Sequence, residues 1–171
     1  MVHILKDVSH GILHMHNQNP PIAHRDIKVE NVLLHNKKFK LCDFGSASTA
    51  TLCHQGMTED AIDEVFETYE RYTTMMYRPP EMIDKYRRSN VSTKVDIWML
   101  GCVAYTLCYA QHPFMESQKL AICNAVYHFP QNPPVPSKLQ DLIRLMLIPD
   151  PEQRPNITKL LAVLDNYSQI P

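Results

Sequence analysis

The sequence has no long apolar run, no large excess of either charge and few glycines. No stretch reaches the ~18 apolar residues of a membrane-spanning helix, so we expect no transmembrane segment. The N-terminus mixes charged and apolar residues, unlike a secretory signal peptide. The 17 basic and 18 acidic residues leave a formal net charge of −1, which gives no indication of nucleic-acid binding. The four glycines, at positions 11, 45, 56 and 101, are too far apart to form a glycine-rich phosphate loop of the form G-x-G-x-x-G.

Cysteine and histidine usage argues against structural disulfides and zinc sites. The number of cysteines is odd and no C-x-x-C pair occurs, which fits a reducing compartment better than a disulfide framework. The cysteines are Cys42, Cys53, Cys102, Cys108 and Cys123. His10 and His14 could contact a metal from one helix face, but no third ligand has matching spacing. We interpret both histidines as surface or capping residues.

Length and composition are those of one ordinary globular domain. The chain has 171 residues, of which 44% are hydrophobic and 20% charged, and this length is enough to bury a core. Residues 2–16 place apolar side chains at helical spacing and end just before N-P-P, which predicts an amphipathic helix.

The stretch from residue 24 to residue 45 follows that helix and organises the chain. It reads H-R-D-I-K-V-E-N-V-L-L, then a polar turn, then F-K-L-C-D-F-G. Residues 32–34 and 39–42 predict two short strands joined by a four-residue polar loop. This hairpin would make Asn31 and Asp43 neighbours. An amide and a carboxylate that converge on one point suit a hard cation such as Mg²⁺, which takes oxygen ligands.

Together, H-R-D-x-K-x-x-N and D-F-G resemble the catalytic and metal-binding loops of protein kinases. The resemblance implies that Asp26 accepts or orients the proton of the substrate hydroxyl and that Lys28 neutralises charge on the transferred phosphoryl group. It also implies that Asn31 and Asp43 hold Mg²⁺. ATP would contact Glu30, Asn31, Leu33, Cys42 and Asp43. A lone D-F-G is common by chance and a lone Asp-x-Lys is usually a solvated loop, but the joint pattern around a hairpin favours the kinase interpretation. A lysine two positions after the aspartate resembles the Ser/Thr branch of the family.

Residues 43–81 resemble a kinase activation segment that ends in T-T-M-M-Y-R-P-P-E, with proline at position 79 where the family usually has alanine. We expect a loop over residues 46–58 and a helix within residues 59–72. The resemblance implies that Thr74 bonds the catalytic aspartate and lysine. It implies that Arg25 faces a phosphorylated or acidic residue of the segment.

Residues 93–109 are apolar on all sides, which predicts a buried core helix. The T-K-V-D at its start predicts a capping box between Thr93 and Asp96. The D-x-W-x-x-G pattern resembles the central helix of the kinase C-terminal lobe, where this aspartate braces the H-R-D turn. Similarly, Arg154 matches the family arginine that pairs with Glu81. Further helices are predicted over residues 116–126, 138–147 and 157–167.

The resemblance therefore implies a protein kinase-like α+β fold, in which residues 1–167 form a mainly α-helical C-terminal lobe with a small β-hairpin at the catalytic loop. We expect the N-terminal lobe, with its Gly-rich loop and V-A-x-K strand, to be absent from this sequence. The chain would then be an incomplete kinase domain and inactive on its own.

Within the family, K-V-E-N-V-L-L, L-C-D-F-G-S-A, D-I-W-M-L-G-C and H-P-F resemble the numb-associated kinases, which include the actin-regulating kinases. This resemblance implies ATP- and Mg²⁺-dependent phosphorylation of protein substrates such as clathrin adaptors or actin-patch proteins, in the cytoplasm at endocytic or cortical actin sites. Two alternatives stay open. The chain is a non-catalytic binding module, or it is a fragment or incomplete gene product.

Overall fold

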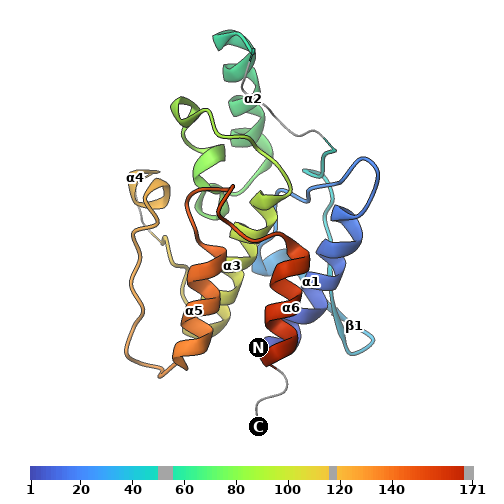
Figure 1. Ribbon diagram of the computed structural model, residues 1–171, viewed down its shortest axis with the longest axis vertical. Coiled ribbons are helices and arrows are strands. Elements are labelled where there is room, and N and C mark those ends of the chain that lie inside the picture. The colour runs from blue at the N-terminus through green and yellow to red at the C-terminus, as the bar shows by residue number, and fades with distance from the viewer. Residues whose placement is uncertain (50–55, 116–118, 168–171) are drawn as a thin grey trace.

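The computed structural model describes residues 1–49, 56–115 and 119–167 of the chain. These residues form a mainly helical molecule with one small hairpin (Figure 1). The helices are α1 (Val2–His16), α2 (Glu59–Tyr72), α3 (Lys94–Tyr109), α4 (Lys119–Cys123), α5 (Ser137–Met146) and α6 (Ile157–Tyr167). The strands are β1 (Val32–His35) and β2 (Lys38–Leu41), and four 3-10 turns are η1 (Val29–Asn31), η2 (Met75–Tyr77), η3 (Pro80–Met82) and η4 (Lys85–Arg87). This composition agrees with the expected helix-rich α+β class.

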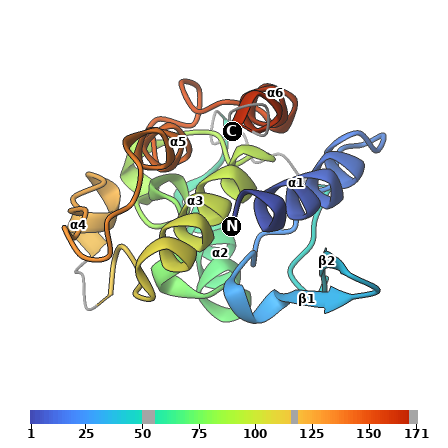
Figure 2. The ribbon, with the colours of Figure 1, turned by 90° about the horizontal axis from the view of Figure 1, so that it is seen from below.

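Helix α3 is the centre of the core, as its all-round apolar sequence predicts. Viewed along the molecule, α1 and α5 lie beside it, and both pack against it (Figure 2). Its residues are buried from Val95 to Tyr105. Trp98 is fully buried and stacks on Phe114, with ring centroids 5.5 Å apart. A helix that is apolar all round has no face suited to water, so it is stable only where other elements cover it.

One glycine lets α3 approach α5 closely. A Cβ at Gly101 would lie 2.9 Å from both Leu147 Cδ2 and Met146 Cβ. Contacts of that length are shorter than van der Waals packing allows, so only a residue without a side chain fits there.

The hairpin differs from the predicted one in the length of its turn. Strands β1 and β2 pair antiparallel, and the register extends to a pair between His35 and Lys38, which leaves only Asn36 and Lys37 in the turn. Both turn residues have positive φ, 49° and 62°. Two left-handed residues match the twist of the strands, and asparagine tolerates this conformation well. The predicted four-residue loop was therefore wrong.

The predicted capping box at the start of α3 is also wrong. The Thr93 side chain makes no capping hydrogen bond. Instead, the Lys94 amide donates to Ser92 Oγ at 3.3 Å. The Asp96 carboxylate is instead directed at the loop before the hairpin, where the His24 and Arg25 backbone amides donate to it.

The remaining helices follow their predictions with small changes at the ends. Helices α1, α2 and α6 have the predicted bounds, and α5 begins and ends one residue early. Helix α4 is shorter than predicted and ends at Cys123; the predicted residues 116–118 lie outside the described part. Within the predicted loop of residues 46–58, residues 50–55 also lie outside it.

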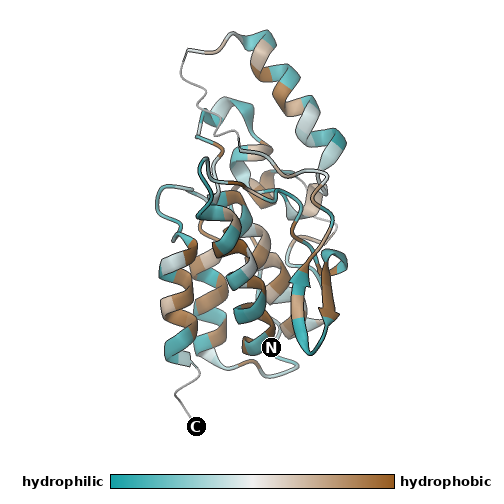
Figure 3. Cartoon of the chain, turned by 90° about the vertical axis from the view of Figure 1, so that its right-hand side faces the viewer, coloured by the Kyte–Doolittle hydropathy of each residue, from teal (hydrophilic) through white to brown (hydrophobic). Residues whose placement is uncertain are grey.

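Helix α2 projects from one end of the molecule, away from the helices that pack around α3 (Figures 1 and 3). Helix α1 packs against α6 and β2, and α3 packs against α5. Among the described residues, no helix combines the length and apolar character needed to cross a membrane.

Candidate active site

The loop from Ala23 to Lys28 is held by the first turn of α3. The Asp96 carboxylate, fully buried, accepts hydrogen bonds from the backbone amides of His24 (2.8 Å) and Arg25 (2.9 Å). These two bonds are the bracing contact that the sequence predicted, and they satisfy a charge that would be costly to bury alone. His16 Nε2 lies 2.8 Å from the same carboxylate. Sequence reasoning missed His16, although its place at the end of the helix before the loop could have indicated it.

A second attachment joins this loop to the segment after the hairpin. Ala23 and Ser48 form an isolated antiparallel bridge, with both backbone hydrogen bonds at 2.9 Å. The His24 ring packs 5.2 Å from the ring of Phe44. The H-R-D turn is therefore fixed from α3 on one side and from the D-F-G segment on the other.

Both carboxylate oxygens of Asp26 are positioned by neighbouring donors. Oδ1 accepts hydrogen bonds from the Thr74 amide (3.1 Å) and the Thr74 hydroxyl (2.9 Å). Oδ2 lies 2.8 Å from Lys28 Nζ, and Lys28 also donates to Thr74 Oγ1 at 3.0 Å. Asp26, Lys28 and Thr74 thus form a closed triangle of polar contacts. The resemblance to protein kinases implied that Thr74 would bond both the aspartate and the lysine.

The neighbours of Asp26 keep it ionised. Burial by itself would raise the pKa of this carboxyl group, but hydrogen bonds from Lys28 and Thr74 outweigh the burial and leave the pKa below its ordinary value. The side chain is 8% exposed, so its negative charge is presented from a largely desolvated position. An ionised, oriented carboxylate of this kind can accept a proton or orient a hydroxyl group.

Asn31 and Asp43 offer oxygens suited to a divalent cation. The Asn31 amide nitrogen donates to the Asp26 carbonyl at 2.8 Å and lies 3.3 Å from its carboxylate, which directs the nitrogen inward. In the described part of the chain, Asn31 Oδ1 accepts no hydrogen bond. Asp43 is exposed, and its Oδ1 accepts a hydrogen bond from the Gly45 amide at 3.3 Å. The Cys42 amide donates to the Asn31 carbonyl at 3.0 Å, so the hairpin does bring the two segments together.

This donor set fits Mg²⁺ in its chemistry. An amide oxygen and a carboxylate are hard ligands, and Mg²⁺ is usually held by one or two protein oxygens together with water and substrate phosphates. Over residues 1–49, 56–115 and 119–167, no group of three His, Cys, Asp or Glu side chains is arranged to hold a metal ion. A cation at Asn31 and Asp43 would take its remaining ligands from water or from substrate phosphates.

Two residues of the candidate site have unusual backbone conformations. Arg25 has a φ of 66° and Asp43 a φ of 59°, both in the left-handed region that non-glycine residues seldom adopt. Such strain persists only where surrounding contacts over-determine it, and it gathers at functional sites.

The surroundings of Arg25 include a tyrosine of α2. Arg25 is buried, and its guanidinium carbon lies 5.8 Å from the centroid of the Tyr69 ring. Burial raises the pKa of Tyr69 to about 12, so the ring stays neutral. Both residues line a cavity of about 250 Å³ whose wall includes the hydroxyl groups of Ser46 and Thr73. The predicted phosphorylated or acidic partner of Arg25 stays a prediction.

Glu81 and Arg154 form a fully buried bidentate ion pair. Arg154 Nη1 lies 2.8 Å from Oε1, and Nη2 lies 3.1 Å from Oε2. Each residue is 1% exposed. The remaining guanidinium donors reach the Lys94 and Ile148 carbonyls, and the group lies 5.2 Å from the centroid of the Trp98 ring. The predicted pairing is present, and it ties the end of the segment at η3 to the late part of the chain.

Besides Asn31 and Asp43, three further residues predicted to contact the nucleotide lie in or beside the hairpin. Leu33 is 53% exposed, Glu30 is exposed and Cys42 is partly exposed. The His24 ring nitrogen Nε2 donates to the Cys42 carbonyl at 3.1 Å. Contact of these residues with ATP stays a prediction.

Arg78 is a further buried residue that sequence reasoning did not single out. Its guanidinium donates to Thr73 Oγ1 at 2.6 Å and to the Glu70 carbonyl at 3.0 Å. It also donates to the Thr73 carbonyl at 2.6 Å. These bonds satisfy the Glu70 and Thr73 carbonyls at the C-terminal end of α2 and fix Thr73, which precedes Thr74. Its position just before P-P-E was the available signal.

Comparison with known proteins identifies the family. A profile described as protein kinase domain matches residues 1–164, nearly the whole chain, so this chain belongs to the protein kinase family. A Dictyostelium discoideum protein named "probable serine/threonine-protein kinase" is 42% identical over 167 residues, which cover 95% of this chain and 20% of that protein.

Two Saccharomyces cerevisiae proteins are similar over all of this chain. Actin-regulating kinase 1 is 38% identical over 172 residues, and actin-regulating kinase PRK1 is 40% identical over 172 residues. The chain spans 27% and 21% of their respective lengths. The predicted similarity to actin-regulating kinases is therefore confirmed.

Proposed function

We propose that this chain supplies the catalytic loop and activation segment of a Ser/Thr protein kinase, with residues 1–167 as the C-terminal lobe and residues 43–81 as the activation segment. The observation that carries the proposal is the triangle of Asp26, Lys28 and Thr74. It joins an ionised carboxylate, a lysine and the segment that would present the acceptor residue.

In this proposal each side chain has one task. Asp26 accepts or orients the proton of the acceptor hydroxyl, because its Oδ1 and Oδ2 are both held in place and ionised. Lys28 offsets negative charge on the phosphoryl group, and Asn31 and Asp43 hold Mg²⁺ against the phosphates of ATP. When bound, Mg-ATP supplies the phosphoryl group and part of the charge neutralisation.

The acceptor type and the substrates rest on resemblance and on the names of the relatives. Lys28 two positions after Asp26, and the Ser/Thr name of the Dictyostelium relative, support serine and threonine acceptors. The names of the two yeast relatives support substrates in actin-regulatory or endocytic assemblies, and hence action at cortical actin sites in the cytoplasm.

A non-catalytic binding module is the second candidate. It is favoured by exposed apolar side chains in and just after the hairpin. These are Leu33 (53% exposed) and Leu34 (64%) of β1 and Phe44 (55%) after β2. In the kinase proposal, an N-terminal lobe covers part of this region.

The test joins the chain to the N-terminal lobe of actin-regulating kinase 1 and compares the fusion with the chain alone. We expect phosphate transfer from ATP to threonine-containing peptides by the fusion and no transfer by the chain alone, because phosphoryl transfer depends on positioning by both lobes. Asp26→Asn in the fusion is the control, and it should remove activity. A folded fusion that binds ATP but transfers no phosphate would favour the binding module.

A further inference from the structure

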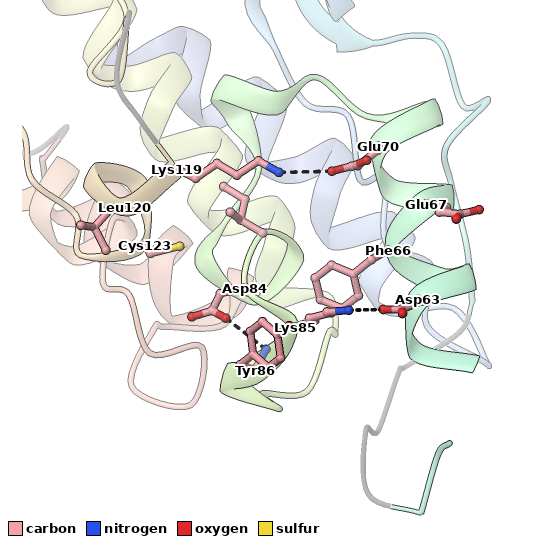
Figure 4. Close-up of a pocket in the computed structure, with 11 residues that line it drawn as sticks. Asp63, Phe66, Glu67, Glu70, Asp84, Lys85, Tyr86, Lys119, Leu120 and Cys123 are labelled. Carbon is pink, nitrogen blue, oxygen red and sulfur yellow. Dashed lines mark hydrogen bonds and ion pairs between the residues drawn. The ribbon is translucent and has the colours of Figure 1, made fainter. Parts of the chain in front are cut away.

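A groove separate from the Asp26 site lies between α2, the η3–η4 region and α4 (Figure 4). Its volume is about 510 Å³, within the range of about 300–1,000 Å³ that is typical of ligand sites in proteins. Phe66 of α2, Ile83 and Cys123 contribute apolar surface to its lining. The groove therefore offers buried contact area as well as charge.

Two ion pairs cross the groove at different points along α2 (Figure 4). Lys85 Nζ lies 2.5 Å from Asp63 Oδ1, and Lys119 Nζ lies 3.2 Å from Glu70 Oε1. Both pairs are substantially exposed, with the carboxylate side chains 50% and 61% exposed. Exposed pairs of this kind are weak, so an incoming cation can compete with either lysine.

The groove has more negative than positive groups. Four carboxylates line it, those of Asp63, Glu67, Glu70 and Asp84, against the two lysines. Both lysines are already paired with groove carboxylates, so the unbalanced charge is negative. Helix α2 as a whole carries six acidic residues and one arginine in E-D-A-I-D-E-V-F-E-T-Y-E-R-Y.

Two highly exposed apolar side chains also line the groove. Tyr86 is 79% exposed and Leu120 is 69% exposed, on η4 and α4 respectively. Exposed apolar side chains that lie together and are rimmed by polar groups are typical of interaction surfaces.

We propose that this groove binds an extended segment of a protein partner in which arginine alternates with bulky apolar residues. Arginine fits because its planar guanidinium makes bidentate bonds to carboxylates such as those of Asp63 and Glu70. Leucine-like side chains of the segment fit the lining made by Phe66 and Leu120. The acidic character excludes nucleic acids and anionic membrane surfaces, which require a basic site.

Binding across this groove would connect α2 to α4. Because the Arg78 bonds tie the C-terminal end of α2 to Thr73, which precedes Thr74, an occupant would hold the segment that contacts Asp26. The proposal concerns binding only, and it stands whether or not the chain transfers phosphate.

The test measures fluorescence anisotropy of the 171-residue chain with a fluorescein-labelled peptide, G-R-L-G-R-L-G-R-L-G. We expect saturable binding that weakens as NaCl rises, because salt screens charges over a Debye length of about 10 Å at 0.1 M. Peptides with glutamate in place of arginine, or serine in place of leucine, should bind much more weakly.

Matched variants locate the site. The double variant Asp63→Asn, Glu70→Gln should weaken binding roughly fivefold, since exposed charge pairs are individually modest. The double variant Asp60→Asn, Glu64→Gln changes the same net charge on exposed positions of the same helix and should leave the affinity unchanged. Leu120→Ser should weaken binding, whereas Leu34→Ser on the hairpin, of similar exposure, should not.

Three outcomes would overturn the proposal. One is no saturable binding up to roughly 1 mM peptide. Another is equal weakening by the two double variants, which would mean that only the general charge of α2 attracts the peptide. The third is a concentration-dependent dimer in sedimentation that Leu120→Ser abolishes, which would assign the groove to a second copy of this chain.

Discussion

At the scale of single residues, the buried polar groups determine how the chain responds to substitution. The guanidinium of Arg154 is enclosed with Glu81 away from water. Removing one partner leaves the other as an uncompensated buried charge. The resulting loss of folding free energy is much larger than the net stabilisation that the intact pair provides.

Arg154→Ala should therefore lower the free energy of unfolding by about 3–5 kcal/mol in urea titrations of the chain. The double variant Glu81→Met, Arg154→Met should cost much less than the sum of the two single changes. Asp43→Ala is the control, because that carboxylate is exposed and makes one backbone hydrogen bond. A loss below about 1 kcal/mol for Arg154→Ala would show that the pair is dispensable.

His112 makes the stability of the fold depend on pH. The ring is 6% exposed, accepts a hydrogen bond from the Phe114 amide and packs 4.5 Å from the Tyr77 ring, and burial lowers its pKa from 6.5 to about 4. The folded state thus holds a neutral ring where the unfolded state binds a proton, so stability is full above pH 6.5 and falls as pH drops towards 4.

Between those pH values the free energy of unfolding should fall by an amount on the order of 3 kcal/mol, because each unit of pKa difference between the folded and unfolded states is worth about 1.4 kcal/mol. Urea unfolding at several pH values tests this, and His112→Gln should flatten the dependence in that window. His10→Gln, at an exposed position of α1, should leave the change of unfolding free energy with pH unaltered. An unchanged slope in His112→Gln would assign the pH dependence to other groups.

At the scale of elements, the two helical glycines have opposite roles. Gly101 lies where a Cβ would come within 2.9 Å of α5 and the residue after it, whereas a Cβ at Gly11 would meet only Leu41 Cδ1 at 3.9 Å, an ordinary contact. The first glycine is required by packing between α3 and α5. The second only reduces the helix propensity of α1.

Gly101→Ala should therefore lower the free energy of unfolding by about 1–3 kcal/mol through overpacking. Gly11→Ala should raise it by about 0.5–1 kcal/mol, because alanine restricts the unfolded chain and favours the helix. Thermal unfolding of the two variants beside the parent chain measures both. Equal shifts of the same sign would refute the packing role of Gly101.

At the scale of the whole molecule, some residues of the candidate site stabilise the fold, whereas others are proposed to act on ATP. Asp96 is fully buried and bridges α3 to the catalytic loop, while Asp43 is exposed beside the hairpin. Substitutions at the two aspartates should therefore affect different properties of the fusion with an N-terminal lobe.

In that fusion, Asp43→Ala should reduce kcat by at least about 100-fold with a Tm within about 2 °C of the parent, since one metal ligand is lost and no buried contact changes. Asp96→Ala should lower Tm by several degrees, because the His24 and Arg25 amides lose their acceptor. Rates and melting curves for both variants separate the two effects. An Asp43→Ala fusion with near-normal kcat would contradict the metal assignment.

Local patterns in the sequence were sufficient to place most of the described helices, though not to give the bounds of α4, and to indicate the family. The apolar spacing of residues 2–16, 59–72 and 157–167 predicted α1, α2 and α6, since helix amphipathicity depends only on residues a few positions apart. The family was indicated by resemblance, because H-R-D-x-K-x-x-N and D-F-G are short continuous motifs that can be compared with known families without a structure.

Tertiary structure alone decided which partner each polar group takes. Asp96 could cap its own helix or bind the His24 and Arg25 amides, and only the packed arrangement brings those amides within 2.9 Å. The pairing of His35 with Lys38 likewise followed from strand twist rather than from polarity. The groove beside α2 was also absent from any local pattern, because its lining comes from segments that are distant in the chain. Which of several possible partners a polar group binds depends on which of them lies nearby in the folded structure. A local sequence pattern does not contain that information.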